Sequence, residues 1–96
     1  MHEFDSGAKS SEEAPRYDLL EPAFLALVAQ RMAQGAATHG ARNYRKGMDD
    51  PAFIQDRINH LVGHVVKLAA GDDSDDHLAA AGANLNMLAV LLRRTP

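Results

Sequence analysis

The sequence predicts an all-α protein, a small helical bundle of three main helices in which the second and third form an antiparallel hairpin. Of the 96 residues, 46% are apolar and only 5% are aromatic. A core poor in rings and rich in alanine and leucine favours closely packed helices over a sheet. Apolar residues also recur in three- and four-residue steps in three separate segments. Since a domain of this size buries only part of its apolar surface, we expect oligomerisation to complete the bundle.

The first fifteen residues, MHEFDSGAKSSEEAP, are polar and contain few large apolar side chains. This composition predicts a flexible acidic arm over residues 1–15, followed by a single domain over residues 16–96. The arm contains four acidic side chains and one basic one, which account for the formal net charge of -3, and the rest of the chain contains nine of each sign. We therefore expect no nucleic-acid binding through bulk charge.

The first helix is predicted over about 22–38. Pro22 suits a first helical turn, where its missing N–H has no helical partner, and Gly40 is a suitable stop. The apolar residues between them follow helical spacing and are Phe24, Leu25, Val28, Met32 and Ala36.

Two further stripes of the same spacing predict the second and third helices. A loop over 40–50 leads to a helix start at Asp50-Pro51, and Gly71 ends this second helix. The turn GDDSDD at 71–76 offers caps for the third helix, and acidic groups suit its first turn. The two stripes are Ile54, Ile58, Leu61, Val65 and Leu68, and then Leu78, Ala81, Leu85, Leu88 and Leu92.

Some classes of protein are excluded by what the sequence lacks. There is no cysteine, so neither a disulfide framework nor a cysteine-ligated zinc site can form. A run of about 18 apolar residues is missing, so we expect no membrane span. The N-terminus lacks the apolar stretch of a signal peptide, so we expect a cytoplasmic protein.

A polar ridge is predicted on the second helix, formed by Arg57, His60, His64 and Lys67 at 3-4-3 spacing. Such a ridge can be ordinary solvated surface. It can also bind an anion or phosphate, because Arg and Lys donate to phosphate and His titrates near neutrality. His60 and His64 are spaced as metal ligands can be, but the intervening residues do not form the HExxH motif.

The loop GAATHGARNYRKG at 35–47 is the second candidate site. Backbone N–H groups near its glycines, with its basic side chains, would suit a phosphate, and Tyr44 would stack on a base. Its spacing matches neither the P-loop nor the dinucleotide-binding fingerprint. An ordinary connection between helices, with Tyr44 packed over the core, is the alternative.

The acidic turn at 71–76 and the start of the third helix form the third candidate. Carboxylates of this turn can hold Mg or Mn ions, which in turn hold phosphates, or they can simply cap the helix. His77 and Asn84 are seven residues apart and share a face beside Ala80 and Ala81. Those small residues leave room either for a ligand or for the close approach of another helix.

Four blocks of the sequence occur in the order found in a phage family. They are RYDLLEP at 16–22, GAATHGARNYRKG at 35–47, RINHLVGH at 57–64 and GDDSDDHLAAAGANLNML at 71–88. Together they resemble the dATP/dGTP diphosphohydrolase N-terminal domain, over roughly residues 14–92. The family often has Lys-Tyr-Gly in place of residues 38–40, and tryptophan in place of Tyr44, so the ring at a stacking position differs.

The resemblance implies an all-α, phage-encoded protein that binds purine nucleotides in the host cytoplasm. Family-like positions are Arg16, Asp18, Gly35, Gly40, Asn43, Lys46, Gly47, Arg57, His60, Gly71, Asp73, His77 and Asn84. With the neighbouring polar groups, the expected nucleotide- and phosphate-binding residues are Gly35, His39, Arg42, Asn43, Tyr44, Lys46, Arg57, His60, His64, His77 and Asn84.

Three functions follow from these sites. A diphosphohydrolase would cleave dATP or dGTP to the monophosphate and pyrophosphate, with Mg or Mn held by Asp73, Asp76 and His77. The ExxE helix of MazG-like pyrophosphohydrolases is missing, and no catalytic residue is assigned. A non-catalytic protein would sequester a cyclic or modified nucleotide used in antiviral defence, in pockets at subunit interfaces of a homo-oligomer. A helical partner-binding protein is the third alternative.

Overall fold

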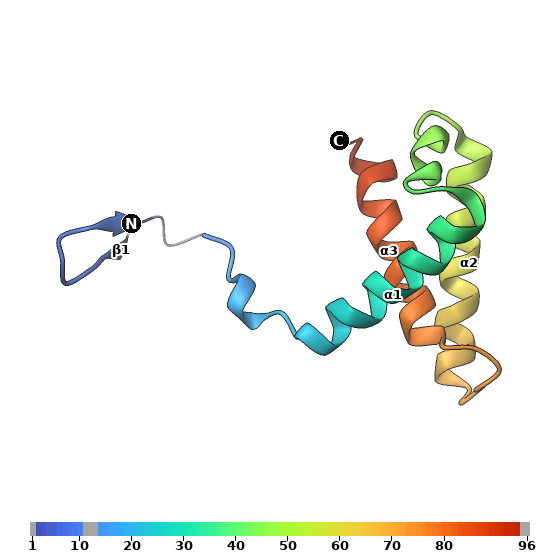
Figure 1. Ribbon diagram of the computed structural model, residues 1–96, viewed down its shortest axis with the longest axis horizontal. Coiled ribbons are helices and arrows are strands. Elements are labelled where there is room, and N and C mark those ends of the chain that lie inside the picture. The colour runs from blue at the N-terminus through green and yellow to red at the C-terminus, as the bar shows by residue number, and fades with distance from the viewer. Residues whose placement is uncertain (1, 11–13, 95–96) are drawn as a thin grey trace.

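The three predicted helices are present in the computed structural model, which describes residues 2–10 and 14–94 (Figure 1). Helix α1 spans Pro22–His39, α2 spans Pro51–Ala69 and α3 spans His77–Arg93. Two short 3-10 helices, η1 at Tyr17–Leu19 and η2 at Asn43–Gly47, lie before and after α1. The prediction of a small all-α bundle is confirmed, and α2 and α3 pack side by side as the predicted hairpin.

The N-terminal arm contains a local feature that the sequence did not indicate. Strands β1 (His2–Glu3) and β2 (Lys9–Ser10) pair antiparallel, with Glu3 opposite Lys9. Gly7 lies in the turn between them at φ 87°, a conformation that glycine adopts without strain. Figure 1 shows this hairpin away from the helices. Part of the predicted flexible arm, residues 1 and 11–13, lies outside the described residues, and flexibility stays a prediction.

The helix ends follow the capping residues in the sequence. Asp50 accepts a hydrogen bond from the backbone N–H of Phe53 at 3.2 Å, and Asp76 accepts one from Ala79 at 3.0 Å. Gly40 and Gly71 follow α1 and α2 at φ 94° and 75°, where L side chains are strained. These backbone requirements explain why the helix boundaries could be predicted.

The connection between α1 and α2 differs from the simple loop predicted over 40–50. Residues 43–47 form η2, which begins after Arg42 in the left-handed conformation at φ 60° and ψ 20°. Gly47 is buried, and a Cβ at this position would collide with the ring of Phe53. Close packing of Gly47 on α2 therefore folds the connection back against the bundle.

The core is formed mainly by the small residues of α3. Its buried apolar residues are Ala79, Ala80, Ala81, Ala83, Leu88 and Leu91. Gly82 lies at the crossing with α1, because a Cβ there would come within 2.7 Å of Val28 and 3.0 Å of Phe24. The small residues let the helices approach closely, as the alanine-rich composition suggested.

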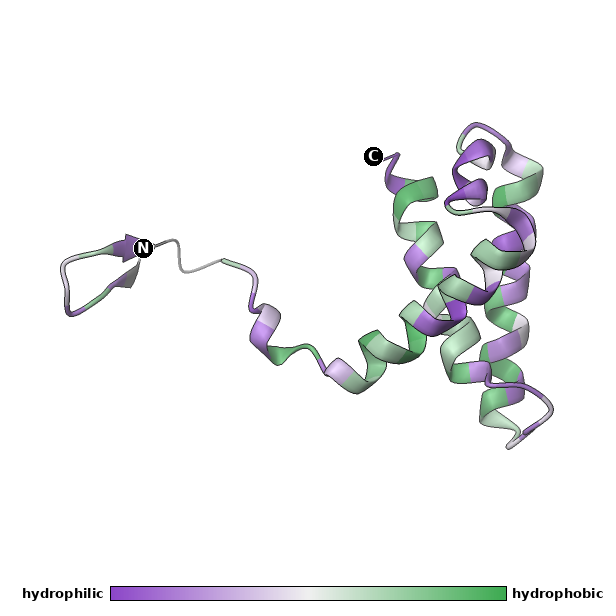
Figure 2. Cartoon of the chain, viewed as in Figure 1, coloured by the Kyte–Doolittle hydropathy of each residue, from purple (hydrophilic) through white to green (hydrophobic). Residues whose placement is uncertain are grey.

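Much of the apolar surface remains exposed. None of the residues of α1 (22–39) or α2 (51–69) is buried, and three leucines of the predicted third stripe, Leu78, Leu85 and Leu92, are 44–58% exposed. Figure 2 shows apolar segments on the part of α1 that extends beyond the other helices. The radius of gyration is 17.2 Å, against roughly 12–13 Å for a compact domain of this length.

Within residues 2–10 and 14–94, no helix has the length and the hydropathy needed to cross a lipid bilayer.

Replacement of Gly82 by alanine tests the close crossing of α1 and α3. We expect Gly82→Ala to lower the free energy of unfolding by about 1–3 kcal/mol, since the added methyl group must displace Val28 or Phe24. The matched control is Gly63→Ala in α2, where a Cβ meets no atom within 4 Å and should add about 0.5–1 kcal/mol through helix propensity. Urea unfolding of both variants measures the two effects, and equal stabilities would contradict the crossing.

Candidate functional site

A central pocket of about 430 Å³ opens between α1, the connection to α2, and the facing sides of α2 and α3. Its volume lies in the range of roughly 300–1,000 Å³ that is typical of small-molecule sites. The residues that line it are Arg31, Met32, Gly35, Ala36, His39, Gly40, Arg42, Asn43, Tyr44, Phe53, Arg57, His60, His64, Ala80, Ala83, Asn84 and Met87. Of these described residues none is acidic and six are arginine or histidine, so the pocket favours an anionic ligand.

The wall from α1 is made by one face of that helix. Arg31, Gly35 and His39 recur every four residues and therefore lie above one another. A Cβ at Gly35 would meet no atom within 4 Å, so this glycine leaves open space beside the pocket. The chain then turns at Gly40 and Arg42, which brings Arg42, Asn43 and Tyr44 onto the same pocket.

Arg57 is the central cation of the α2 wall. Its guanidinium carbon lies 5.6 Å from the ring centre of Phe53, one turn earlier, in cation–π range. One terminal nitrogen donates to Asp56 at 2.9 Å, and this contact lowers the pKa of the Asp56 carboxyl. The Nε of Arg57 is buried without a hydrogen-bond partner. A buried donor of this kind is costly unless a ligand or water accepts from it.

His60 presents a free ring nitrogen because its other nitrogen is committed to the backbone. Its Nδ1 lies 2.8 Å from the carbonyl oxygen of Asp56, and a carbonyl can only accept, so Nδ1 bears the proton. The 3.3 Å approach of an Arg57 nitrogen to the same atom is then a contact between two donors. The remaining Nε2 of neutral His60 is an acceptor, and protonation converts it into a donor for an anion.

The wall from α3 contains one buried polar side chain, Asn84, which is 5% exposed. Its Nδ2 donates to the carbonyl of Ala80 at 3.0 Å, which fixes the orientation of the amide. Its Oδ1 is buried with no hydrogen-bond partner. Ala80 and Ala83 flank it with small side chains. The lining of the pocket therefore contains a residue with an unpaired buried acceptor on α3 and one with an unpaired buried donor on α2.

A linked group of side chains lies beside the pocket, where the acidic turn meets α2. His77 is 3% exposed, its Nε2 lies 2.8 Å from Oδ1 of Asp72, and its Nδ1 lies 2.9 Å from Nδ1 of His64. Hydrogen bonds from Ser74 and then from His77 hold the pKa of the Asp72 carboxyl well below its usual range. Burial lowers the pKa of His64, with a further contribution from His77.

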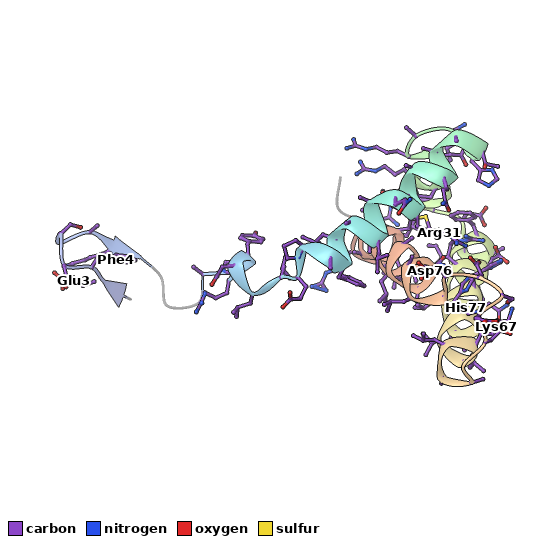
Figure 3. All side chains as sticks on the ribbon, turned by 60° about the horizontal axis from the view of Figure 1, so that its bottom comes forward. Glu3, Phe4, Arg31, Lys67, Asp76 and His77 are labelled. Carbon is purple, nitrogen blue, oxygen red and sulfur yellow. The ribbon has the colours of Figure 1, made fainter. Side chains whose placement is uncertain are left out.

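Arg31 connects this group to α1. It binds Asp75 through two hydrogen bonds of 2.8 and 3.0 Å, and this pairing lowers the pKa of the Asp75 carboxyl. Figure 3 labels Arg31 on α1, and Asp76 and His77 at the start of α3. Ligand-type atoms of His64, Asp75 and His77 all lie within 4.8 Å of one another.

The structure brings together most of the residues expected to bind a nucleotide. Nine of the eleven line the pocket, namely Gly35, His39, Arg42, Asn43, Tyr44, Arg57, His60, His64 and Asn84. Lys46 is exposed on η2 and is not among the lining residues, and His77 lies behind His64. Placement alone does not test their roles, which stay predictions.

Of the expected metal ligands Asp73, Asp76 and His77, only His77 belongs to the described group of neighbouring ligand-type atoms, and their role as ligands stays a prediction. Asp76 uses its carboxylate to cap α3, and Asp73 is absent from the described group of His64, Asp75 and His77. Sequence reasoning also missed Arg31 and Phe53. Their spacing was a usable signal, because Arg31 is four residues before Gly35 and Phe53 is four before Arg57.

These features define a small all-α protein with an anion-favouring pocket between its helices. The family model for the dATP/dGTP diphosphohydrolase N-terminal domain matches residues 5–96. The chain therefore belongs to this family, as its four sequence blocks predicted. No curated protein and no solved structure matches the chain.

Substitution of Arg57 tests whether the pocket binds anions through direct contacts. We expect Arg57→Gln to weaken the binding of inorganic triphosphate about tenfold to a hundredfold, because a hydrogen bond to a charged group contributes about 1.5–3 kcal/mol. The control is Lys67→Gln, which removes the same charge from the same ridge outside the pocket. Calorimetric titration measures both, and equal losses would indicate a diffuse charge effect instead of a site.

Proposed function

We propose that the central pocket binds a purine deoxynucleoside triphosphate and that the protein hydrolyses it to the monophosphate and pyrophosphate. The observation that carries this proposal is the pairing of basic side chains with a buried, unpaired amide oxygen in one pocket of suitable volume. Membership of the dATP/dGTP diphosphohydrolase N-terminal family supports the choice of nucleotide.

The arginines of the pocket are suited to the phosphates. Arg57 has an unpaired Nε, Arg42 lines the pocket at the turn after α1, and Arg31 lines it from α1. Arginine binds phosphate with a planar fork of donors and stays charged at all relevant pH values. His60 adds a donor when protonated. Asp56 and Asp75 already offset part of the charge of Arg57 and Arg31, so the three arginines would offset only part of the charge of a triphosphate.

Asn84 is suited to the base. Its Oδ1 can only accept a hydrogen bond, and adenine and guanine both offer an exocyclic amino group as a donor. Because the amide nitrogen is held by Ala80, Asn84 cannot turn to offer a donor instead without losing that bond. Tyr44, in place of the tryptophan frequent in the family, offers a ring on which the base would stack.

Hydrolysis between the α and β phosphates consumes one water and releases a monophosphate and pyrophosphate. A divalent cation such as Mg²⁺ or Mn²⁺ would supply Lewis-acid stabilisation of the phosphates. The groups present next to the pocket, His64, Asp75 and His77, would suit Mn²⁺. Because the sequence blocks resemble those of phage proteins, we propose that this activity takes place in the cytoplasm of an infected host cell.

Turnover is tested by incubating the full chain with dATP or dGTP and Mn²⁺ and separating the products by chromatography. We expect monophosphate and pyrophosphate in equal amounts, and a rate at least tenfold lower for Arg57→Gln than for Lys67→Gln, because only Arg57 contacts the pocket. Unchanged nucleotides with every divalent cation tried would contradict hydrolysis.

A second candidate function is sequestration of a cyclic or modified nucleotide without turnover. It is favoured by one observation: of the described residues lining the pocket none has a carboxylate that could act as a general base. A sequestered ligand would be recovered unchanged and would raise the melting temperature, since a ligand at about 100 times its Kd adds about 2.7 kcal/mol of stability. A nucleotide panel that neither reacts nor stabilises the protein would contradict both functions.

We also propose that the chain forms a homo-oligomer through its exposed apolar surface. Val62, Val65 and Val66 of α2 are 49–60% exposed, as are Leu85 and Leu92 of α3 at 55% and 58%. Several exposed apolar side chains on two neighbouring helices would suit a protein interface.

Self-association is tested by sedimentation of the Leu85→Glu variant. We expect the wild-type chain to sediment as an oligomer and Leu85→Glu to shift it to the monomer, because a charge must be buried at the interface. Asn86→Glu adds the same charge at the next exposed position and should leave the oligomer intact. A wild-type monomer at all concentrations would contradict the proposal.

A further inference from the structure

We propose that His64, His77 and Asp75 form a binding site for a divalent transition-metal ion, with Asp72 and Arg31 orienting two of the ligands. This proposal names the cation that the proposed function requires. The role of this cation in hydrolysis rests on the proposed function. Metal binding itself is a separate property of these side chains. The site differs from the set Asp73, Asp76 and His77 expected from the sequence.

The tautomer of His77 is fixed in the form that a metal requires. Asp72 accepts at 2.8 Å from Nε2 of His77, and it also accepts from the hydroxyl and the backbone N–H of Ser74. A carboxylate held by three donors stays ionised, so Nε2 of His77 must bear its proton. The lone pair of His77 therefore lies on Nδ1, the atom that faces His64. Carboxylate, histidine and metal in this order are the usual arrangement of a metal-bound imidazole.

The two facing nitrogens lie close to the separation that a shared metal would impose. Nδ1 of His64 and Nδ1 of His77 are 2.9 Å apart, so without a metal one proton of His64 must lie between them. Metal–nitrogen bonds of about 2.0–2.1 Å at tetrahedral angles place two nitrogens roughly 3.3 Å apart. The rings need to separate by only a few tenths of an ångström, while the proton of His64 moves to its Nε2.

Asp75 provides the third ligand and is held ready by Arg31. Each carboxylate oxygen has two lone pairs, and Arg31 occupies one on each oxygen at 2.8 and 3.0 Å. The backbone N–H of Asp76 occupies the second lone pair of Oδ1 at 2.7 Å, so the second lone pair of Oδ2 is the one available within the same 4.8 Å group. Arg31 and His64 also line the central pocket, so the open positions of the metal would face a ligand bound there.

The chemistry of the ligands selects the class of metal. Two imidazoles and one carboxylate favour manganese, iron, cobalt or zinc, whereas magnesium is typically bound by oxygen atoms alone. His77 is almost completely buried, and the described titratable side chains around it include Asp72, His64 and Asp75. An almost buried histidine held in one tautomer and facing a second histidine is explained by a shared metal ion.

The test measures binding of Co²⁺ to the metal-free full chain without nucleotide, by calorimetry and by the visible absorption of the bound ion. We expect one Co²⁺ per chain. His64→Asn and Asp75→Asn should each weaken binding at least tenfold through loss of a ligand, and Asp72→Asn about tenfold through loss of orientation. Asp73→Asn is the matched control in the same acidic turn and should bind as the wild-type chain does. His64 and Asp75 are partly exposed, so circular dichroism of these variants should remain that of the wild type.

The proposal is overturned if the wild-type chain does not bind Co²⁺. It is also overturned if Asp73→Asn weakens Co²⁺ binding while His64→Asn does not. Melting temperatures with dATP, measured without metal on the same samples, separate this inference from the proposed function. If dATP stabilises the protein but Co²⁺ does not bind, the metal site is contradicted and the nucleotide pocket is supported. If Co²⁺ binds with the expected variant pattern but dATP does not raise the melting temperature, the metal site is supported and the proposed ligand of the pocket is contradicted.

Discussion

The close crossing of α1 over α3 at Gly82 determines where every wall of the pocket lies. A side chain at this position would collide with Val28 and Phe24, and the neighbouring alanines of α3 are buried in the same contact. Since α1 approaches here, its next turns place Arg31, Gly35 and His39 across from the polar ridge of α2. The small side chains of α3 therefore have two consequences. They allow tight helix packing at Gly82, and they leave open space beside Asn84.

Two side-chain atoms of pocket residues lack a hydrogen-bond partner, as does Nε of Arg45 on η2. Asn84 Oδ1 and Arg57 Nε are buried without partners, although buried polar groups in folded proteins are nearly always hydrogen-bonded. They differ from His77, which is buried to a similar degree but is bonded at both ring nitrogens. The contrast separates His77, whose two ring nitrogens have partners within the chain, from two pocket atoms for which the proposed ligand would supply the partners.

The sequence was a good guide to the elements and a partial guide to the site. Helix positions follow from apolar spacing and from caps such as Asp50, Asp76 and Gly40, all of which act locally. Most pocket residues were found because they cluster in two short blocks. The grouping of His64, Asp75 and His77, which we propose as a metal site, was not predicted from the sequence. The direction of each carboxylate in the acidic turn depends on its backbone: Asp76 faces the N–H of Ala79, while Asp75 faces Arg31 on another helix. Periodicity predicted the third helix but not the exposure of leucines such as Leu85, because it does not reveal how many helices surround a stripe.

The central claim is that a purine nucleotide binds between α1, α2 and α3. The most direct measurement is an experimental structure of the full chain with a non-hydrolysable dATP analogue. The account predicts the exocyclic amino group within hydrogen-bond distance of Asn84 Oδ1 and the phosphates in contact with Arg57 Nε. An analogue bound elsewhere on the protein, or a pocket in which both atoms stay unpaired beside the bound analogue, would contradict it.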